Sequence, residues 1–174
     1  PLNKRYCTRL QAYVASGQSQ LVFHPVTAEI ILAGQPQPDD WDRLVEDGFD
    51  AVINMRSDPE RAAVQSQVAR QAGLDYIHLN LPAYELEPEH IQQFQDVLNQ
   101  LNSERILIHC RTGSRVGLIW MLHRMLNEGW SEQAAAEELV AAGYDEDDLD
   151  TFAYCTGDYF ERSEAELQSG AVAG

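Results

Sequence analysis

The chain has 174 residues, of which 44% are hydrophobic, and this is enough for one domain with a sizeable core. Its 28 acidic and 12 basic residues give a formal net charge of −16, so the surface repels nucleic acids and acidic membranes, and neither is an expected partner. No segment approaches the ~20 apolar residues of a membrane span, and the first residues lack a signal-peptide pattern, so we expect a soluble, cytoplasmic protein.

The three cysteines are Cys7, Cys110 and Cys155, and they form no C-x-x-C pair. An odd number without such pairs indicates neither a disulfide framework nor a zinc site. We therefore expect free thiols in a reducing compartment, and neither a metal nor another cofactor.

Strand and helix patterns alternate through the first half of the chain. Runs of β-branched and apolar residues predict strands, and apolar residues at spacings of three and four predict helices. The predicted elements are a helix at 4–16, short strands at 21–23 and 29–32, a helix from Asp39 or Asp40 to Gly48, a strand at 51–55 and a helix from Pro59 to Gly73. Ser57 or Asp58 is expected to cap this last helix.

The same alternation continues to the end of the chain. The predicted elements are a strand at 76–81, a helix after Pro88 that extends to Leu101, a strand at 106–108, a helix at 115–127, a helix from Ser131 to Gly143 and a last helix that opens with the acidic run 145–148. Acidic residues in the first turn stabilise a helix. We expect residues 163–174 to form a flexible tail because they are small and polar.

This order predicts an α/β three-layer sandwich with a central, mostly parallel sheet of four or five strands flanked by helices. Residues 1–20 are expected to form an N-terminal helical extension, and residues 21–162 the main domain. Ligands of such sheets bind at the carboxyl ends of the strands. Three loops are therefore expected to converge on one site, at 56–60, 82–88 and 110–115.

The segment 105–115 carries the most informative chemistry. An apolar strand ends at Cys110, a loop with Gly113 follows, and a helix begins near Arg115. The backbone N–H groups of 111–115 are expected to point at one anion at the N-terminus of this helix. The same positive potential favours a Cys110 thiolate, which can act as a nucleophile. The Arg115 guanidinium suits two oxygens of a phosphate or sulfate.

The pattern His109-Cys110-x-x-Gly113-x-Arg115 resembles the signature loop of the cysteine-dependent phosphatases, and equally that of the rhodaneses. The usual tyrosine and dual-specificity phosphatase loop has five residues between cysteine and arginine, followed by Ser or Thr. This chain has four, and Val116 follows. A spacing of four is similar to rhodanese domains and to a bacterial group of dual-specificity-like phosphatase domains found beside beta-lactamase-like hydrolases. The loop alone leaves both classes open.

The upstream sequence favours the phosphatase group. The features that resemble it are Ala-Gly-Gln-Pro at 33–36, the Val-Ile-Asn strand with Arg56 after it, and a Leu-x-Leu-Pro strand end at 79–82. The Asp-x-Arg and Gly-His-Ile segments expected of a rhodanese are missing from the sequence. The resemblance implies a metal-independent phosphatase that hydrolyses a phosphomonoester. The alternatives are a rhodanese-like sulfurtransferase with a Cys110 persulfide and a non-catalytic phosphate-binding protein.

The resemblance also assigns roles within the loop. Cys110 attacks phosphorus, Arg115 and the loop backbone bind the phosphoryl oxygens, and water hydrolyses the resulting cysteinyl-phosphate. The other loop residues expected to contact phosphate are Arg111, Thr112, Gly113 and Ser114. His109 is expected to orient the loop.

The general acid and the substrate are less well defined by the sequence. The family places an Asp on the loop after the preceding strand, whereas this loop reads Tyr-Glu-Leu-Glu at 84–87. Glu85 is therefore the candidate acid, with Glu87 and Asp58 as alternatives. Arg56 and Asp58 are also candidate substrate contacts. The expected substrate is a phosphorylated protein or a small phosphorylated molecule.

Overall fold

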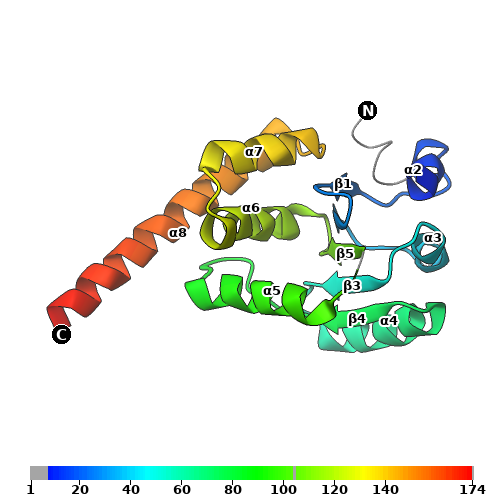
Figure 1. Ribbon diagram of the computed structural model, residues 1–174, viewed down its shortest axis with the longest axis horizontal. Helices are drawn as coiled ribbons and strands as arrows, with labels where there is room; N and C mark the ends of the chain where they lie inside the picture. The colour runs from blue at the N-terminus through cyan, green and yellow to red at the C-terminus, as the bar shows by residue number, and fades with distance from the viewer. Residues whose placement is uncertain (1–7, 104, 174) are drawn as a thin grey trace.

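The computed structural model describes residues 8–103 and 105–173, and in this part of the chain a five-stranded sheet lies between two layers of helices (Figure 1). The strands are β1 (Phe23–Pro25), β2 (Ile30–Ala33), β3 (Ala51–Asn54), β4 (Asp75–His78) and β5 (Ile106–His109). Their order is β1-β2-β5-β3-β4; β1 is antiparallel to β2, and the other neighbouring pairs are parallel. The predicted α/β sandwich with a mostly parallel sheet is confirmed.

The central strands are apolar without alternation because helices cover both faces of the sheet. Every residue of β3 and β5 is buried. In β5, Ile106 and Ile108 pack into one half of the core and Leu107 packs into the other, as successive side chains of a strand must. The strand that leads to Cys110 is therefore held rigidly on both sides.

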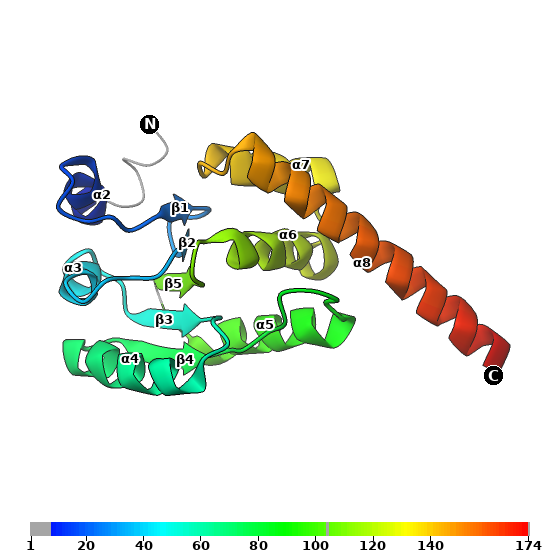
Figure 2. The ribbon, with the colours of Figure 1, turned by 180° about the vertical axis from the view of Figure 1, so that it is seen from behind.

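The helices divide between the two faces of the sheet, as Figures 1 and 2 show from opposite sides. One layer holds α2 (Thr8–Ala15), α3 (Asp40–Glu46) and α4 (Pro59–Ala72), and the other holds α5 (Pro88–Leu101), α6 (Ser114–Glu128), α7 (Glu132–Ala141) and α8 (Glu146–Ala173). Helix α6 contacts α5, α7 and α8. It is buried without interruption from Val116 to Arg124, so it forms the centre of its layer.

The start of α4 shows how local sequence fixes a boundary beside the site. The Asp58 carboxylate accepts hydrogen bonds from the backbone N–H groups of Glu60 and Arg61 at 3.0 and 3.2 Å, and Pro59 is the first helical residue. The helix ends at Gly73, whose φ of 104° lies in the left-handed region that favours glycine. Both boundaries agree with the prediction.

The early elements differ from the expectations at their ends. Helix α2 begins at Thr8, and residues 4–7 of the predicted helix, Cys7 included, lie outside the described residues. The first strand begins at Phe23 rather than at residue 21. Strand β4 ends at His78, which lengthens the following loop.

The C-terminal region also differs from the expectation. Where the sequence predicts a flexible tail at 163–174, α8 continues as a helix to Ala173, and its end projects beyond the other helices (Figure 1). The reason is that Glu, Ala, Leu and Gln, all strong helix formers, dominate residues 164–168. Although α8 has 28 residues, neither it nor any other described helix is long and apolar enough to cross a membrane.

Candidate active site

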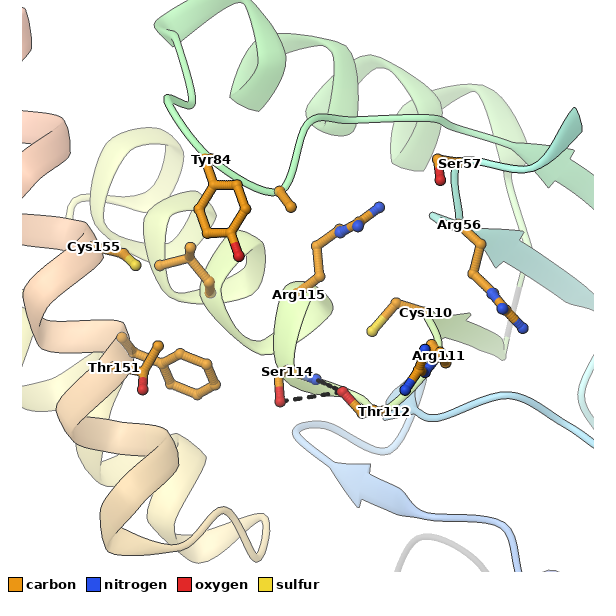
Figure 3. Close-up of a pocket in the computed structure, with 13 residues that line it drawn as sticks. Arg56, Ser57, Tyr84, Cys110, Arg111, Thr112, Ser114, Arg115, Thr151 and Cys155 are labelled. Carbon is orange, nitrogen blue, oxygen red and sulfur yellow. Dashed lines mark hydrogen bonds between the residues drawn. The ribbon is translucent and has the colours of Figure 1, made fainter.

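A cavity of about 440 Å³ opens at the carboxyl ends of the parallel strands. Its lining residues come from four segments: Arg56 and Ser57 after β3, Ala83 and Tyr84 after β4, Cys110, Arg111, Thr112, Ser114, Arg115 and Leu118 at and after β5, and Thr151, Phe152 and Cys155 on α8 (Figure 3). The three loops expected to converge do so. The fourth wall, from α8, is not predicted by the sequence.

Cys110 lies at the inner end of this cavity and is only 3% exposed. Its Sγ accepts a hydrogen bond from the backbone N–H of Gly113 at 3.1 Å. Gly113 has a φ of 92° and is the N-cap of α6, so it turns the loop back toward the sulfur without a side chain in the way. The sulfur thus sits at the N-terminus of α6, where unpaired N–H groups favour an anion.

Tyr144, which lies outside the loop, holds the carbonyl group of Gly113 in place. The Tyr144 hydroxyl donates a hydrogen bond to the Gly113 carbonyl at 2.7 Å, and the Gly117 N–H also donates to it, at 3.2 Å. The C=O and N–H of a trans peptide point in opposite directions, so anchoring this carbonyl also sets the direction of the Ser114 N–H. Burial and the neighbouring Cys110 raise the pKa of Tyr144 well above its usual value, which keeps the hydroxyl protonated as a donor.

Close packing holds Tyr144 in this position. Its ring stacks on His24 at 3.7 Å between ring centroids, and His24 Nδ1 lies 3.0 Å from the Ala142 carbonyl. Burial lowers the pKa of His24, so the neutral ring can donate from Nδ1. A Cβ on Gly117 would lie 2.9 Å from Tyr144 and 2.6 Å from Phe152. A glycine is therefore needed in α6 for these rings to reach the loop.

His109 lies beneath the loop and does not line the cavity. It is fully buried, and its Nδ1 lies 3.2 Å from the Cys110 carbonyl. Burial lowers the pKa of His109 to about 4, so the ring is neutral near pH 7 and can donate from Nδ1. Its Nε2 has no hydrogen-bond partner within the part of the chain that the structure describes. This geometry supports orientation of the Cys110 backbone rather than proton transfer to a substrate.

Arg115 connects the loops around the cavity. Its Nη1 donates to the Met55 carbonyl at 2.7 Å and to the Leu81 carbonyl at 3.4 Å. Figure 3 shows the guanidinium directed away from Thr151 and Cys155 on α8. A guanidinium has five N–H donors, so it can keep this anchor and still bind an anion. Arg115 thus ties the ends of two neighbouring strands to the nucleophile loop.

The three candidate acids lie outside this cavity. Glu85 is exposed, has a φ of 56°, and borders a smaller adjoining hollow of about 100 Å³ that shares Tyr84 with the cavity. Glu87 caps α5 and lies 3.6 Å from Arg162. The Asp58 carboxylate is the cap of α4. The described lining of the cavity therefore contains arginines and no carboxylate.

Several residues that shape the site carried no recognisable signal in the sequence. Tyr144 and His24 act through contacts with segments far away in the chain. Gln35 belongs to the motif at 33–36, but its contacts with Arg56 and Arg111 are not predicted. Tyr84, whose side chain is 82% exposed, is prominent at the mouth of the cavity only because the loop folds beside α8. Phe152 lies on the predicted last helix, but its place in the cavity wall is not predicted by the sequence.

Part of the chain, including the Cys110 loop, is similar to known phosphatase-like proteins. Residues 22–127 match the model of a family described as beta-lactamase hydrolase-like protein, phosphatase-like domain. The beta-lactamase hydrolase-like protein of Xylella fastidiosa is 24% identical over 107 residues, which are 59% of this chain and 25% of the relative. The dual specificity protein phosphatase TpbA of Pseudomonas aeruginosa is 40% identical over 82 residues, which are 40% of this chain and 38% of the relative. The chain thus spans well under half the length of these relatives.

Solved structures show the same fold. A phosphatase-like protein of Shewanella putrefaciens has a TM-score of 0.63 at 18% identity, covering 84% of this chain and 96% of that chain. Pseudomonas aeruginosa TpbA in complex with phosphotyrosine has a TM-score of 0.58 at 22% identity, covering 76% of this chain and 80% of that chain. At these identities the likeness concerns the fold alone.

Proposed function

The chain belongs to the family of phosphatase-like domains of beta-lactamase hydrolase-like proteins, and we propose that it is a metal-independent phosphatase that hydrolyses phosphomonoesters through a cysteinyl-phosphate. One observation carries the proposal. On a chain with a net charge of −16, the nucleophile candidate Cys110 lies in a cavity whose only charged lining residues, within the described structure, are three arginines. Such a cavity binds an anion against the field of the whole molecule.

The proposed reaction has two steps. In the first, the Cys110 thiolate attacks phosphorus in line with the ester bond, an S–P bond forms, and the P–O bond to the leaving group breaks. The loop N–H groups and Arg115 stabilise the charge on the three equatorial oxygens in the transition state. In the second step, water attacks the cysteinyl-phosphate, which releases phosphate and restores the thiolate.

The leaving oxygen must receive a proton in the first step, and the same group must accept one from water in the second. Glu85 is our candidate for both transfers because it follows Tyr84, a residue of the cavity wall. A movement of the loop 82–87 would bring its carboxylate into the cavity. The left-handed backbone at Glu85 supports this proposal, since a non-glycine residue is strained there and a loop movement can relieve that strain.

The substrate in this proposal is a phosphorylated protein or a small phosphorylated molecule. An aryl phosphate is the first substrate to test, because Tyr84 and Phe152 offer aromatic surface beside the cavity. The TpbA structure in complex with phosphotyrosine supports the same choice.

The test is phosphate release from p-nitrophenyl phosphate in the presence of a metal chelator, compared between the wild-type chain and Cys110→Ser. We expect the variant to lose activity by about 10³-fold or more while its melting temperature stays close to that of the wild type. Cyanide-dependent thiosulfate turnover is measured on the same samples. Turnover of thiosulfate through Cys110 without phosphate release would identify a sulfurtransferase, and phosphate binding without either reaction would identify a non-catalytic phosphate-binding protein.

A further inference from the structure

The cavity concentrates positive charge that no carboxylate neutralises among the described residues. Three of the 12 basic residues, Arg56, Arg111 and Arg115, line it. Among the residues that the structure describes, none of these three forms an ion pair, whereas Arg124 and Arg162 each pair with two carboxylates. The charge of the three cavity arginines is therefore available to a bound anion.

One glutamine connects two of these arginines at the same edge of the cavity. The Gln35 backbone N–H donates to the Arg111 carbonyl at 3.1 Å, and Gln35 Oε1 accepts from Arg56 Nη1 at 2.9 Å. Gln35 Nε2 donates to the Pro36 carbonyl at 3.1 Å, which turns the amide oxygen toward Arg56. Figure 3 shows Arg56 and Arg111 on one side of Cys110, with α8 on the other.

Arg56 is also braced through its backbone. Its N–H donates to Asn54 Oδ1 at 2.8 Å, and its carbonyl accepts a hydrogen bond from His78 Nε2. Asn54 is itself fixed, because its Nδ2 donates to the Tyr76 hydroxyl at 2.7 Å. A side chain that is already held in place loses less conformational entropy when a ligand binds. Arg56 is therefore arranged as a binding group rather than as a mobile surface residue.

We propose that Arg56 and Arg111 form a second anion subsite, which binds another phosphate group of a small bisphosphorylated substrate while the reacting phosphoryl group lies over Cys110. This inference rests on the proposed function. One phosphoryl group held by the loop N–H groups and Arg115 leaves the guanidinium groups of Arg56 and Arg111 without an anionic partner among the described residues. Their planar donor arrays match phosphate oxygens.

The charge outside the cavity favours a small molecule over an acidic protein segment. A net charge of −16 repels an acidic polypeptide along its whole contact surface. A small bisphosphate instead places its charges only among the arginines. The cavity volume of about 440 Å³ lies in the range typical of small-molecule sites.

Binding is measured separately from turnover, on the Cys110→Ser chain, by isothermal titration calorimetry. The ligands are two matched pairs that differ only in one phosphate: glucose 6-phosphate with glucose 1,6-bisphosphate, and adenosine 5′-monophosphate with adenosine 3′,5′-bisphosphate. We expect at least one bisphosphate to bind about tenfold or more tightly than its monophosphate, as charge-assisted hydrogen bonds to a second group require.

Single variants then locate the subsite. Adding Arg56→Gln or Arg111→Gln is expected to reduce the preference for the bisphosphate to less than about threefold. The matched control is Arg9→Gln, on the exposed surface of α2, which removes the same charge from a distant position and should preserve the preference. An equal loss in the control would attribute the preference to net charge and overturn the subsite.

The remaining outcomes separate the two proposals. Equal binding of both members of each pair, with aryl phosphatase activity intact in the wild type, overturns the second subsite and leaves the proposed function standing. Failure of every phosphate to bind overturns both. A phosphopeptide with acidic neighbours that binds more tightly than its neutral counterpart, with no preference for the bisphosphates, overturns the small-molecule class and identifies an acidic protein segment as the ligand.

Discussion

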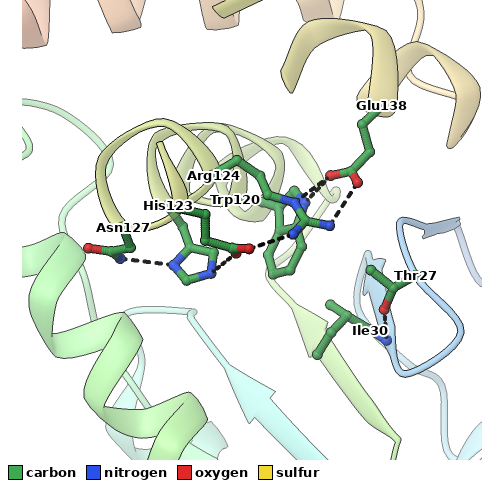
Figure 4. A network of polar contacts seen from close by, with 8 residues as sticks. Thr27, Ile30, Trp120, His123, Arg124, Asn127 and Glu138 are labelled. Carbon is green, nitrogen blue, oxygen red and sulfur yellow. Dashed lines mark hydrogen bonds and ion pairs between the residues drawn. The ribbon is translucent and has the colours of Figure 1, made fainter. Parts of the chain in front are cut away.

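The two ends of helix α6 use arginine in opposite ways. At the C-terminal end, Arg124 pairs with Glu138 at 2.8 Å, and its guanidinium lies 4.7 Å from the centroid of the Trp120 ring (Figure 4). Arg124 also pairs with Glu128 at 2.9 Å and lies 4.1 Å from the centroid of the Trp130 ring. At the N-terminal end, Arg115 bonds only to backbone carbonyls within the described structure, and it faces the cavity.

Helix α6 thus uses the arginine at one end for stability and the arginine at the other end for binding. Arg124 is 9% exposed, and its charge is neutralised by carboxylates, as a buried cation requires. The guanidinium groups of Arg115 and Arg56 bond to neutral groups, so their charge remains available to a ligand. In a chain with more than twice as many acidic as basic residues, arginines without carboxylate partners point to a ligand site.

The largest expected effect comes from removing the charge at the cavity end. Arg115→Gln should lower kcat/KM for an aryl phosphate by about 10³-fold, equivalent to about 4 kcal/mol of transition-state stabilisation. Its free energy of unfolding, measured by urea denaturation, should change much less than that of Arg124→Gln. Equal losses of stability in both variants would remove the distinction between the two ends.

Replacing Arg124, at the C-terminal end of α6, should lower stability rather than activity. Arg124→Gln leaves the Glu138 carboxylate, which is only 13% exposed, without its cation, so we expect a loss of about 3 kcal/mol in urea denaturation. The Glu128 contact contributes less because that carboxylate is 37% exposed and screened by solvent. The kcat/KM of the folded variant should remain within about threefold of the wild type.

The sequence predicts the local parts of this site and misses the parts that depend on long-range contacts. The Cys110 loop, the β5 strand and the Asp58 cap are local: each is determined by residues within a few positions of one another, and the structure contains them as expected. Tyr144 and Gln35 meet the loop only through the folded sheet and helices, so no spacing in the sequence reveals these two contacts, although Gln35 itself lies in the motif at 33–36. Local patterns specify elements, and long-range contacts complete the site.

The candidate acid illustrates the same limit. The sequence identifies the acidic residues of the loop at 84–87, but not the direction of their side chains. In the structure Glu87 caps α5, Tyr84 faces the cavity and Glu85 borders the neighbouring hollow. Glu85 as general acid stays a prediction. The conformation of its loop depends on a distant contact, since Arg162 of α8 donates a hydrogen bond to the Leu86 carbonyl at 3.0 Å.

Two buried histidines extend this contrast to pH: His109 at the end of β5, beside the nucleophile loop, and His123 near the C-terminal end of α6. Burial lowers the pKa of His109 from 6.5 to about 4, and it also lowers the pKa of His123, where Glu128 at 2.8 Å opposes the shift. The neutral form of His109 is therefore favoured in the folded state. The contribution of neutral His109 to the free energy of unfolding is fully present above pH 6.5. It is lost as the pH falls toward 4, by up to about 3 kcal/mol.

The measurement is the urea midpoint and m-value from pH 7.5 to 4 for the wild type, His109→Gln and His123→Gln. Removing His109 should flatten the decline in stability between pH 6.5 and 4 more than removing His123 does, because no carboxylate opposes the shift at His109. A steeper decline in His109→Gln than in the wild type would contradict the buried, neutral assignment.

The smallest expected effect comes from Tyr144, which acts on the cavity through the Gly113 carbonyl. Tyr144→Phe removes one buried hydrogen bond to the loop, worth about 1 kcal/mol, and should weaken inorganic phosphate binding by about fivefold in calorimetry. Tyr159→Phe is the matched control, since this tyrosine on α8 is equally buried and makes no contact of this kind with the loop in the described structure. Similar melting temperatures with different phosphate affinities would establish the positioning role, whereas unchanged affinity in Tyr144→Phe would exclude it.

Chemical trapping of the covalent intermediate examines the step on which the proposed mechanism depends. The wild-type chain is mixed with an aryl phosphate, quenched in acid within milliseconds, digested and analysed by mass spectrometry. The proposed mechanism requires a phosphoryl group on Cys110, with none on Cys155 of the same cavity wall and none in Cys110→Ser. A persulfide on Cys110, or phosphate release with no phosphoryl group on this cysteine, would contradict it.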